Sequence, residues 1–246
     1  MRFFIMTVRY IDQIDIKDKK VLLRVDFNVP YDKDMNITDD TRITATVPTI
    51  EYCLKNNSRI ILVSHLGRPK GVVDPKKSLA PVAEKLSQIL GRPVHFIREE
   101  IGEPARKALG EMKSGDIALL ENIRFYPGET KNDEILGKNL ASLADVYIND
   151  AFATAHRAHS SNESVTKYIP VSAAGFLLKN EIEYFRKALQ HSEKPVAAII
   201  GGVKVSTKID AILNMMPQVD YILIGGGMAF TFLKAQGYAI GKSVCE

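Results

Sequence analysis

The sequence predicts an α/β protein: a doubly wound parallel sheet, then a long linking helix, then an incomplete second α/β, Rossmann-like domain. Apolar, β-branched runs alternate with helical patterns through most of the 246 residues, the order that parallel βαβ units produce. Most of these runs are continuously apolar, as expected of strands buried on both faces of a sheet. The second domain has too few strands to cover both faces of its sheet, so we expect it to be incomplete.

The strands are predicted from these apolar runs, and they cover residues 21–29, 59–66, 93–97, 116–123, 145–150, 195–202 and 220–225. Apolar residues at helical spacing predict helices that begin near Ile43, Leu79 and Ile135, the second with Ser78 as its N-cap. A further apolar stripe predicts a helix over 177–194 that joins the two domains, since no Gly/Ser run suggests a flexible linker. The expected domains are therefore 1–176, 177–194 and 195–246.

Composition excludes several classes of function. The net charge is only +4, with no tryptophan and no run of basic residues, which argues against a nucleic-acid-binding protein. Two cysteines, Cys53 and Cys245, are too few for a disulfide framework or a zinc site and suit a reducing cytoplasm. No apolar stretch approaches the ~20 residues of a membrane span. We expect a soluble cytoplasmic monomer without a structural metal.

Arginines gather in the first domain: eleven of the twelve precede residue 160. Arg68, Arg124 and Arg157 each follow a predicted strand closely, and Arg42 is grouped with Asp26 and Asn28 at the end of another. Ligands of open α/β sheets bind beyond the carboxyl ends of the strands, and guanidinium groups bind phosphate and carboxylate in bidentate fashion. The set predicts a site for a small, highly anionic molecule, although any one of these arginines could simply be solvated at the surface.

Polar residues beside the arginines extend this site. Asp26 and Asn28 alternate along the end of a predicted strand and so point the same way, which suits hydrogen bonds to a substrate hydroxyl. A turn role for Asn28 is the alternative. His65, near Arg68, is either a hydrogen-bond donor to a phosphate or carboxylate or a structural histidine. His156 and His159 lack further ligands at metal spacing, so a metal is not expected there.

The second domain carries lysines in a glycine-rich turn. Gly202, Lys204 and Lys208 lie between a strand and a helix, and a further glycine run includes Gly226. Glycine allows close backbone approach, and a helix N-terminus favours phosphate. Neither the dinucleotide fingerprint nor the P-loop spacing is met, because Phe230 and Gln236 stand where glycines are required. Glycine turns that serve only packing remain the alternative.

Taken together, these segments closely resemble phosphoglycerate kinases from about Thr7 to the end of the chain. The matching blocks are VLLRVDFNVP (21–30), SHLGRPKG (64–71), LLENIRFYPGE (119–129), INDAFATAHRAHSS (148–161), GGVKVSTKI (201–209) and ILIGGGMAFTFL (222–233). The resemblance implies a glycolytic enzyme that transfers a phosphoryl group reversibly between 1,3-bisphosphoglycerate and Mg-ADP, giving 3-phosphoglycerate and ATP. Domain closure would bring the substrates into line and exclude water.

The resemblance also implies roles for individual residues. Arg42 and Lys204 would stabilise the transferred phosphoryl group. The 3-phosphoglycerate site would be formed by Asp26, Phe27, Asn28, Arg42, His65, Leu66, Gly67, Arg68, Arg124 and Arg157. The nucleotide site would include Gly202, Lys204, Lys208 and Gly226. The ligand of Mg²⁺, which accompanies ADP or ATP, would lie beyond Glu246.

Two features depart from the family pattern. Val203 stands where a smaller residue is common, and the sequence given ends at Glu246. The alternative to an active kinase is therefore a truncated, inactive phosphoglycerate-binding fragment, and we expect little phosphoryl transfer by residues 1–246 alone. Since the resemblance begins near Thr7, Met6 is expected to be the true start, or residues 1–5 to be dispensable.

Overall fold

A six-stranded, all-parallel sheet forms the centre of the first of two structural units. The computed structural model describes residues 8–190 and 194–246, without the side chains of 188–190. It divides the chain into Met1–Glu181 and Ile182–Glu246. Met6, the expected true start, lies outside the described residues. So do residues 191–193 of the predicted linking segment. In the order in which they lie across the sheet, the strands are β3 (Val94–Ile97), β4 (Ile117–Leu120), β2 (Arg59–Val63), β1 (Lys20–Arg24), β5 (Val146–Asn149) and β6 (Val171–Ala174).

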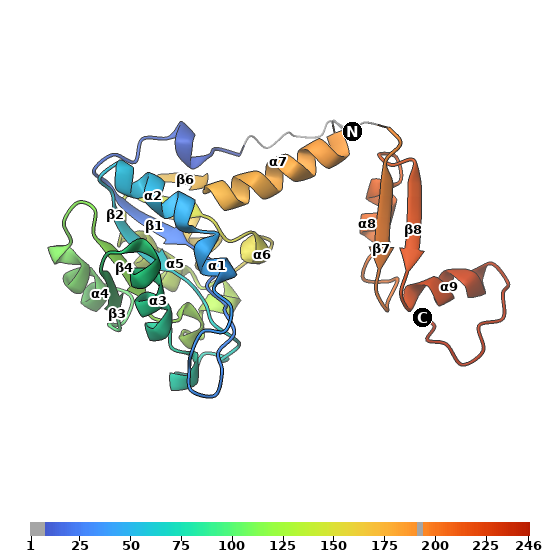
Figure 1. Cartoon of the computed structure of the whole chain (residues 1–246), viewed down its shortest axis with the longest axis horizontal. Helices are drawn as coiled ribbons and strands as arrows, with labels where there is room; N and C mark the ends of the chain where they lie inside the picture. The colour runs from blue at the N-terminus through green and yellow to red at the C-terminus, as the bar shows by residue number, and fades with distance from the viewer. Residues whose placement is uncertain (1–7, 191–193) are drawn as a thin grey trace. The chain divides into compact units, whose positions relative to one another are not determined.

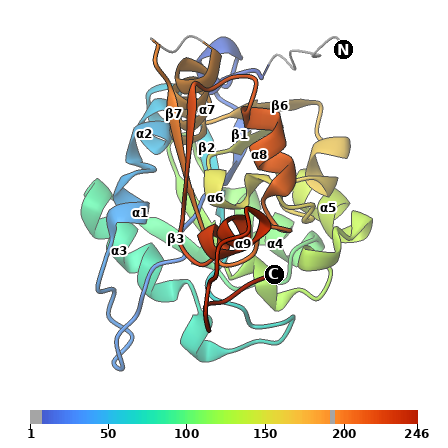
Figure 2. The ribbon, with the colours of Figure 1, turned by 90° about the vertical axis from the view of Figure 1, so that its right-hand side faces the viewer.

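Helices cover both faces of this sheet, which confirms the doubly wound fold class. Successive residues of β1 pack into different cores: Leu23 with Ile50 of α2 and Leu86 of α3, and Leu22 with Leu140 of α5. Figure 2 shows α1, α2 and α3 along one side of the first unit and α5 along the other. The α-helices of this unit are α1 (Thr41–Thr44), α2 (Val47–Lys55), α3 (Ala80–Leu90), α4 (Glu103–Ala108), α5 (Glu134–Ala141), α6 (Phe152–Ala155) and the start of α7 (Phe176–Gln190).

Helix boundaries follow local chemistry. Gly91, with φ of 62°, ends α3 in the left-handed conformation that favours glycine. The Asp133 side chain accepts a 2.8 Å hydrogen bond from the Leu136 amide and caps α5. The helix α3 begins at Ala80 with Leu79 at the N-cap position, one residue later than predicted, but the Ser78 hydroxyl still accepts a 3.2 Å hydrogen bond from the Ala80 amide and donates to Glu121. No helix in residues 8–190 and 194–246 has the length and apolar character to cross a membrane.

The strands are shorter than predicted, and this matters for the site. β1 ends at Arg24, β2 at Val63 and β4 at Leu120. The residues that follow leave the sheet as loops, so the expectation that Asp26 and Asn28 lie on a strand is wrong. The sequence reading also missed β6, whose residues are mostly small, and the six-residue α4. Because all six strands are parallel, the loops after β1, β2, β4 and β5 leave from the same edge of the sheet.

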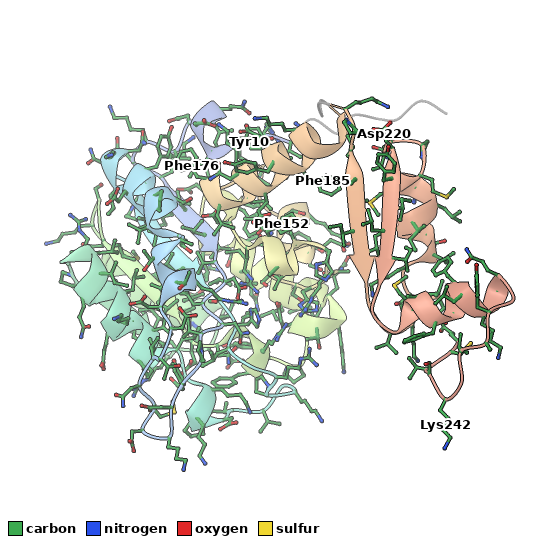
Figure 3. The ribbon with its side chains drawn as sticks, turned by 45° about the vertical axis from the view of Figure 1, so that its right-hand side comes forward. Tyr10, Phe152, Phe176, Phe185, Asp220 and Lys242 are labelled. Atoms are coloured by element: carbon green, nitrogen blue, oxygen red, sulfur yellow. The ribbon has the colours of Figure 1, made fainter. Side chains whose placement is uncertain are left out.

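The second unit contains a parallel pair of strands, β7 (Ala197–Gly201) and β8 (Tyr221–Gly225), with helices α8 (Ile209–Met215) and α9 (Met228–Ala235) (Figure 1). Asp220, labelled in Figure 3, precedes β8. It accepts hydrogen bonds from the Val196 amide and the Lys194 ammonium at 2.8 and 3.0 Å. This contact fixes the start of β7 beside the start of β8.

Short 3-10 helices fill the connections of the first unit: η1 (Ile11–Gln13), η2 (Pro75–Lys77), η3 (Leu109–Glu111), η4 (Ile123–Phe125), η5 (Glu129–Lys131) and η6 (Ser164–Lys167). Two of them, η4 and η5, follow β4 and carry residues of the candidate site.

Candidate anion site

A cavity of about 430 Å³ opens between the loops that follow β2, β4 and β5. Three predicted residues line it together: Arg68, Arg124 and Arg157. The rest of its lining consists of Lys70, Gly71, Tyr126, Pro127, Thr130, Lys131 and His159. No acidic side chain is among these lining residues. The cavity therefore presents several cationic groups to whatever enters it, which suits a phosphate or carboxylate.

Arg124 is the most constrained of the three arginines. It lies in η4, is only 7% exposed, and donates a 2.7 Å hydrogen bond from Nη1 to the Gly67 carbonyl oxygen. Burial, with the nearby Arg157 and Arg24, lowers the pKa of Arg124 from its usual value. Its buried Nε has no hydrogen-bond partner among the described residues. A buried donor of this kind is costly unless a ligand or water satisfies it.

Asn122 joins the two loops that carry Arg68 and Arg124. Its Oδ1 accepts hydrogen bonds from the Leu66 and Arg124 amides at 3.2 and 3.1 Å. Its Nδ2 donates to the Leu66 and Lys77 carbonyl oxygens at 2.8 and 2.9 Å. The fully buried amide thus holds the loop after β2 against the turn after β4. Sequence reasoning missed this residue, because nothing in ENIRF distinguishes a cross-linking asparagine from a turn asparagine.

The loop after β2 approaches the rest of the cavity through glycine. Gly71 has φ of 80°, and a Cβ there would lie 2.9 Å from the Pro127 Cα. The Gly67 amide donates a 2.7 Å hydrogen bond to Asn28 Oδ1. Asn28 therefore anchors the loop that carries Arg68. The bond joins two residues 39 positions apart, so it is not the local turn role that the sequence left open for Asn28.

Arg157 lies in the turn after α6. The Asn162 side chain supports this turn by donating to the Thr154 carbonyl oxygen at 2.7 Å. His159 lines the cavity, whereas His156 is exposed and is not among the lining residues. His159 Nδ1 lies 3.6 Å from Oε1 of the buried Glu129. In residues 8–190 and 194–246, no group of three or more His, Cys, Asp or Glu side chains could hold a metal ion.

Arg42 and Asp26 lie at a different cavity from the three arginines. Their side chains form an ion pair between Arg42 Nη1 and Asp26 Oδ2. Both line a smaller cavity of about 220 Å³, together with Asp150 and Phe152. Phe152 is exposed at the surface (Figure 3). The predicted arginine set is thus divided between two openings of the first unit.

His65 follows β2 and is 4% exposed. Its Nδ1 lies 3.2 Å from Nη2 of the buried Arg24 and 3.9 Å from Asp26 Oδ1. Burial, followed by the charges of Arg24 and the surrounding arginines, lowers the pKa of His65 to about 2. The imidazole is therefore neutral at physiological pH.

Two other predicted site residues are buried. Phe27 is 0% and Leu66 5% exposed, and both belong to the hydrophobic core. Their side chains are therefore unsuited to contact a polar ligand. The Phe27 amide donates to Ser64 Oγ at 2.9 Å and the Leu66 amide to Asn122 Oδ1. Both residues support the loops from within.

The predicted nucleotide residues lie in the second unit, in the turns after β7 and β8. The Met228 amide donates to the Gly202 carbonyl oxygen at 2.8 Å, and a Cβ on Gly226 would lie 2.8 Å from that oxygen. Lys208 Nζ lies 2.8 Å from where a Cβ of Gly202 would stand. Lys204 and Lys208 both precede α8, which begins at Ile209, so they do not share a helix face.

Comparison with known proteins gives consistent results. A family model described as phosphoglycerate kinase matches residues 11–246. The chain is 53% identical, over 98% of its length, to a phosphoglycerate kinase of Geotalea uraniireducens. It is 52% identical, over 98% of its length, to a cytosolic phosphoglycerate kinase of Nicotiana tabacum. The solved phosphoglycerate kinase of Coxiella burnetii matches 98% of the chain with a TM-score of 0.87 and 42% identity, and 60% of that solved chain is covered. The chain spans 61% and 60% of the lengths of the two relatives.

Proposed function

The chain belongs to the phosphoglycerate kinase family, and we propose that its first unit binds 3-phosphoglycerate at the arginine-lined cavity. The observation that carries the proposal is the buried Arg124 Nε, which has no partner among the described residues while Arg68 and Arg157 line the same cavity. A phosphate oxygen would satisfy this donor and neutralise the three guanidinium groups. Its charge-assisted hydrogen bonds would be about twice as strong as neutral ones.

The remaining polar residues of the first unit would bind the glycerate end of the ligand. Asp26 and Arg42 line the neighbouring cavity, and His65 lies near Asp26 and feels the charges of Arg42, Arg124 and Arg157. The neutral imidazole would donate one hydrogen bond to a carboxylate or hydroxyl without adding a charge. Asn28, Gly67 and Leu66 would hold the loops in place rather than provide most of the binding energy.

For catalysis, we infer the family reaction: reversible phosphoryl transfer between 1,3-bisphosphoglycerate and Mg-ADP, in the cytoplasm. Arg42 of the first unit and Lys204 of the second would stabilise charge on the phosphoryl group during transfer. No general base is required, because the acceptor oxygen belongs to a carboxylate or a nucleotide phosphate and is already anionic. Catalysis would therefore depend on positioning and on charge stabilisation.

We propose that a nucleotide binds at the glycine turns of the second unit. A side chain at Gly226 would collide with the Gly202 backbone, so Gly226 allows the two turns to lie close together. Lys204 is exposed there and Lys208 is half-buried. Both would bind nucleotide phosphates. Mg²⁺ accompanies the nucleotide in this family, and no described residue is assigned to it.

The second candidate function is ligand binding without turnover, because every residue that lines the cationic cavity belongs to the first unit. A coupled assay of the 246-residue chain with 1,3-bisphosphoglycerate and Mg-ADP separates the two candidates. ATP formation that is lost in Arg42→Ala and Lys204→Ala supports the kinase. Binding of 3-phosphoglycerate without ATP formation supports the second candidate.

Calorimetry tests the binding proposal itself. We expect one molecule of 3-phosphoglycerate per chain, with an affinity that falls as salt concentration rises because the interaction is ionic. Arg68→Ala should weaken binding by about 1.5–3 kcal/mol, the contribution of a charged hydrogen bond. Arg106→Ala, which removes a surface arginine paired with Glu103 on α4, should leave binding unchanged. Absence of binding, or an equal loss in both variants, would refute the proposal.

A further inference from the structure

A chain of buried polar groups joins four separate segments of the first unit, and one member, Glu129, lies 3.6 Å from His159 in the lining of the cationic cavity. Arg24, at the end of β1, is 0% exposed although it belongs to an apolar strand. Its Nε donates to Ser161 Oγ at 3.0 Å, and its Nη2 lies 3.2 Å from His65 Nδ1. Ser161 Oγ in turn lies 2.6 Å from Glu129 Oε1. Neither Arg24 nor Glu129 was identified from the sequence as a site residue.

The direction of each hydrogen bond follows from the chemistry of the groups. A guanidinium only donates, so Ser161 Oγ accepts from Arg24 and must use its single proton toward Glu129. The Ser161 amide also donates to Glu129 Oε2 at 2.9 Å. Both carboxylate oxygens are therefore acceptors, as in an ionised side chain. For the same reason, His65 Nδ1 accepts from Arg24 and carries no proton.

We propose that Arg24 is a positioning residue that holds His65 in one tautomer, with its proton on Nε2. The Nε2 proton is then available to a ligand, while Nδ1 is engaged inside the protein. The tautomer follows from the Arg24 contact alone. Its use as a donor to 3-phosphoglycerate rests on the function proposed above.

Glu129 provides the countercharge that allows a guanidinium to be buried in this place. It is 0% exposed, and an unpaired buried charge of either sign would be strongly destabilising. Burial opposes its ionisation, but His159, Arg24 and Ser161 together hold the pKa of Glu129 below its usual value. An ionised Glu129 thus balances Arg24 through one hydroxyl group.

The charges around His65 favour the same neutral state. Besides Arg24, they come from Arg42, Arg124 and Arg157, which all lower its pKa, and from the carboxylate of Asp26. Asp26 is itself paired with Arg42, which weakens its attraction for an imidazolium. Protonation of Nδ1 would place a cation against the Arg24 guanidinium. We therefore expect His65 to remain neutral from pH 5 to pH 8.

Nitrogen NMR of the 246-residue chain, labelled with ¹⁵N at its histidines, tests the proposal directly. The chain has five histidines, and the His65 signals are identified by their loss in His65→Gln. We expect the coupling pattern of the tautomer protonated at Nε2, unchanged between pH 5 and pH 8. A tautomer protonated at Nδ1, or a His65 that titrates near pH 6.5, would overturn the proposal, whether or not any ligand binds.

The variant Arg24→Met tests whether Arg24 is the cause. It should leave His65 as a mixture of both tautomers and weaken 3-phosphoglycerate binding about tenfold, the effect of losing one well-placed charged hydrogen bond. Arg106→Met on α4 is the matched control. If Arg24→Met folds and retains a single Nε2-protonated tautomer, Arg24 does not position His65. If it does not fold, the wild-type spectrum still decides the tautomer. If the tautomer changes while binding does not, Arg24 does position His65, but the proposed hydrogen bond from His65 to 3-phosphoglycerate is refuted.

Discussion

Arg124 donates a 2.7 Å hydrogen bond to the carbonyl oxygen of Gly67, and so the turn after β4 is fixed to the loop after β2. The arginine that we expect to bind phosphate is thereby oriented before any ligand arrives. Guanidinium groups held in place in this way lose little side-chain freedom on binding. The first unit thus contains a pre-formed cationic site.

Replacing Arg124 should weaken ligand binding more than it affects folding. We expect Arg124→Met to weaken 3-phosphoglycerate binding by about 1.5–3 kcal/mol, since a buried charged donor is lost from the cavity. Arg124→Lys should restore little of this, because an ammonium cannot reproduce the planar fork that binds both Gly67 and a phosphate. Calorimetry measures the effect, with Arg106→Met as control. Full restoration by lysine would show that only the charge matters.

Asn122 should prove a stability determinant. Asn122→Ala leaves four backbone groups in or beside the buried interior without their partner, and we expect a loss of about 2–4 kcal/mol in the free energy of unfolding. Chemical denaturation monitored by circular dichroism measures it. Asn139→Ala, at a half-exposed position of α5, serves as the comparison. Similar stability of the two variants would contradict the cross-linking role of Asn122.

Glu129→Gln should destabilise the protein in a pH-dependent way. The variant leaves Arg24 buried without a countercharge, which typically costs about 3–5 kcal/mol. Because folding lowers the pKa of Glu129, its contribution is fully present above its ordinary value of 4.5 and is lost as pH falls through the folded-state value. Denaturation curves at several pH values should show the two proteins converge in acid. A constant difference at every pH would contradict an ionised Glu129.

The contribution of Asp150 to stability should depend on pH in the opposite way to that of Glu129. Its Oδ1 accepts a 3.1 Å hydrogen bond from the Leu178 amide at the start of α7, and burial raises the pKa of this carboxyl above its usual value. Its protonated form therefore favours folding below pH 3.8, and this contribution is lost as pH rises through the folded-state pKa.

Two variants of Asp150, one isosteric and one truncated, separate the stabilising effect of the hydrogen bond to α7 from the effect of the buried charge. Asp150→Asn keeps an acceptor for Leu178 without a buried charge, so at pH 7 it should be at least as stable as the wild type. Asp150→Ala should lose about 1–2 kcal/mol, as other helix-cap deletions do. Thermal denaturation checks both, with Asp34→Asn at an exposed position as control. A strongly destabilised Asp150→Asn would show that the charge itself is required.

Much of the fold could be predicted because parallel strands that are buried on both faces have continuously apolar sequences. The runs around Leu22, Ile61 and Leu119 all lie in the sheet. The strand ends could not be predicted in the same way: Asp26 follows an apolar run, yet it lies in the loop after β1, where it pairs with Arg42. The strand β6 was not predicted, because its residues, VSAA, are mostly small and do not form a distinct apolar run.

The candidate site was only partly readable. Arginines near strand ends predict an anion site, and the structure brings Arg68, Arg124 and Arg157 to one cavity. The grouping depends on tertiary contacts, so the separate position of Arg42 was not foreseeable. Arg24 did leave a signal, because a charged residue inside an otherwise apolar strand must be paired when it is buried. Its partners, Ser161 and Glu129, are more than 100 residues away.

A crystal structure of the 246-residue chain with 3-phosphoglycerate is the most direct test of the central claim, that the arginine-lined cavity is the ligand site. We predict the phosphate group within hydrogen-bonding distance of Arg124 Nε and between the guanidinium groups of Arg68 and Arg157. The glycerate end should extend toward His65 and Asp26. A ligand bound elsewhere on the first unit, or a phosphate that leaves Arg124 Nε without a partner, would contradict the claim.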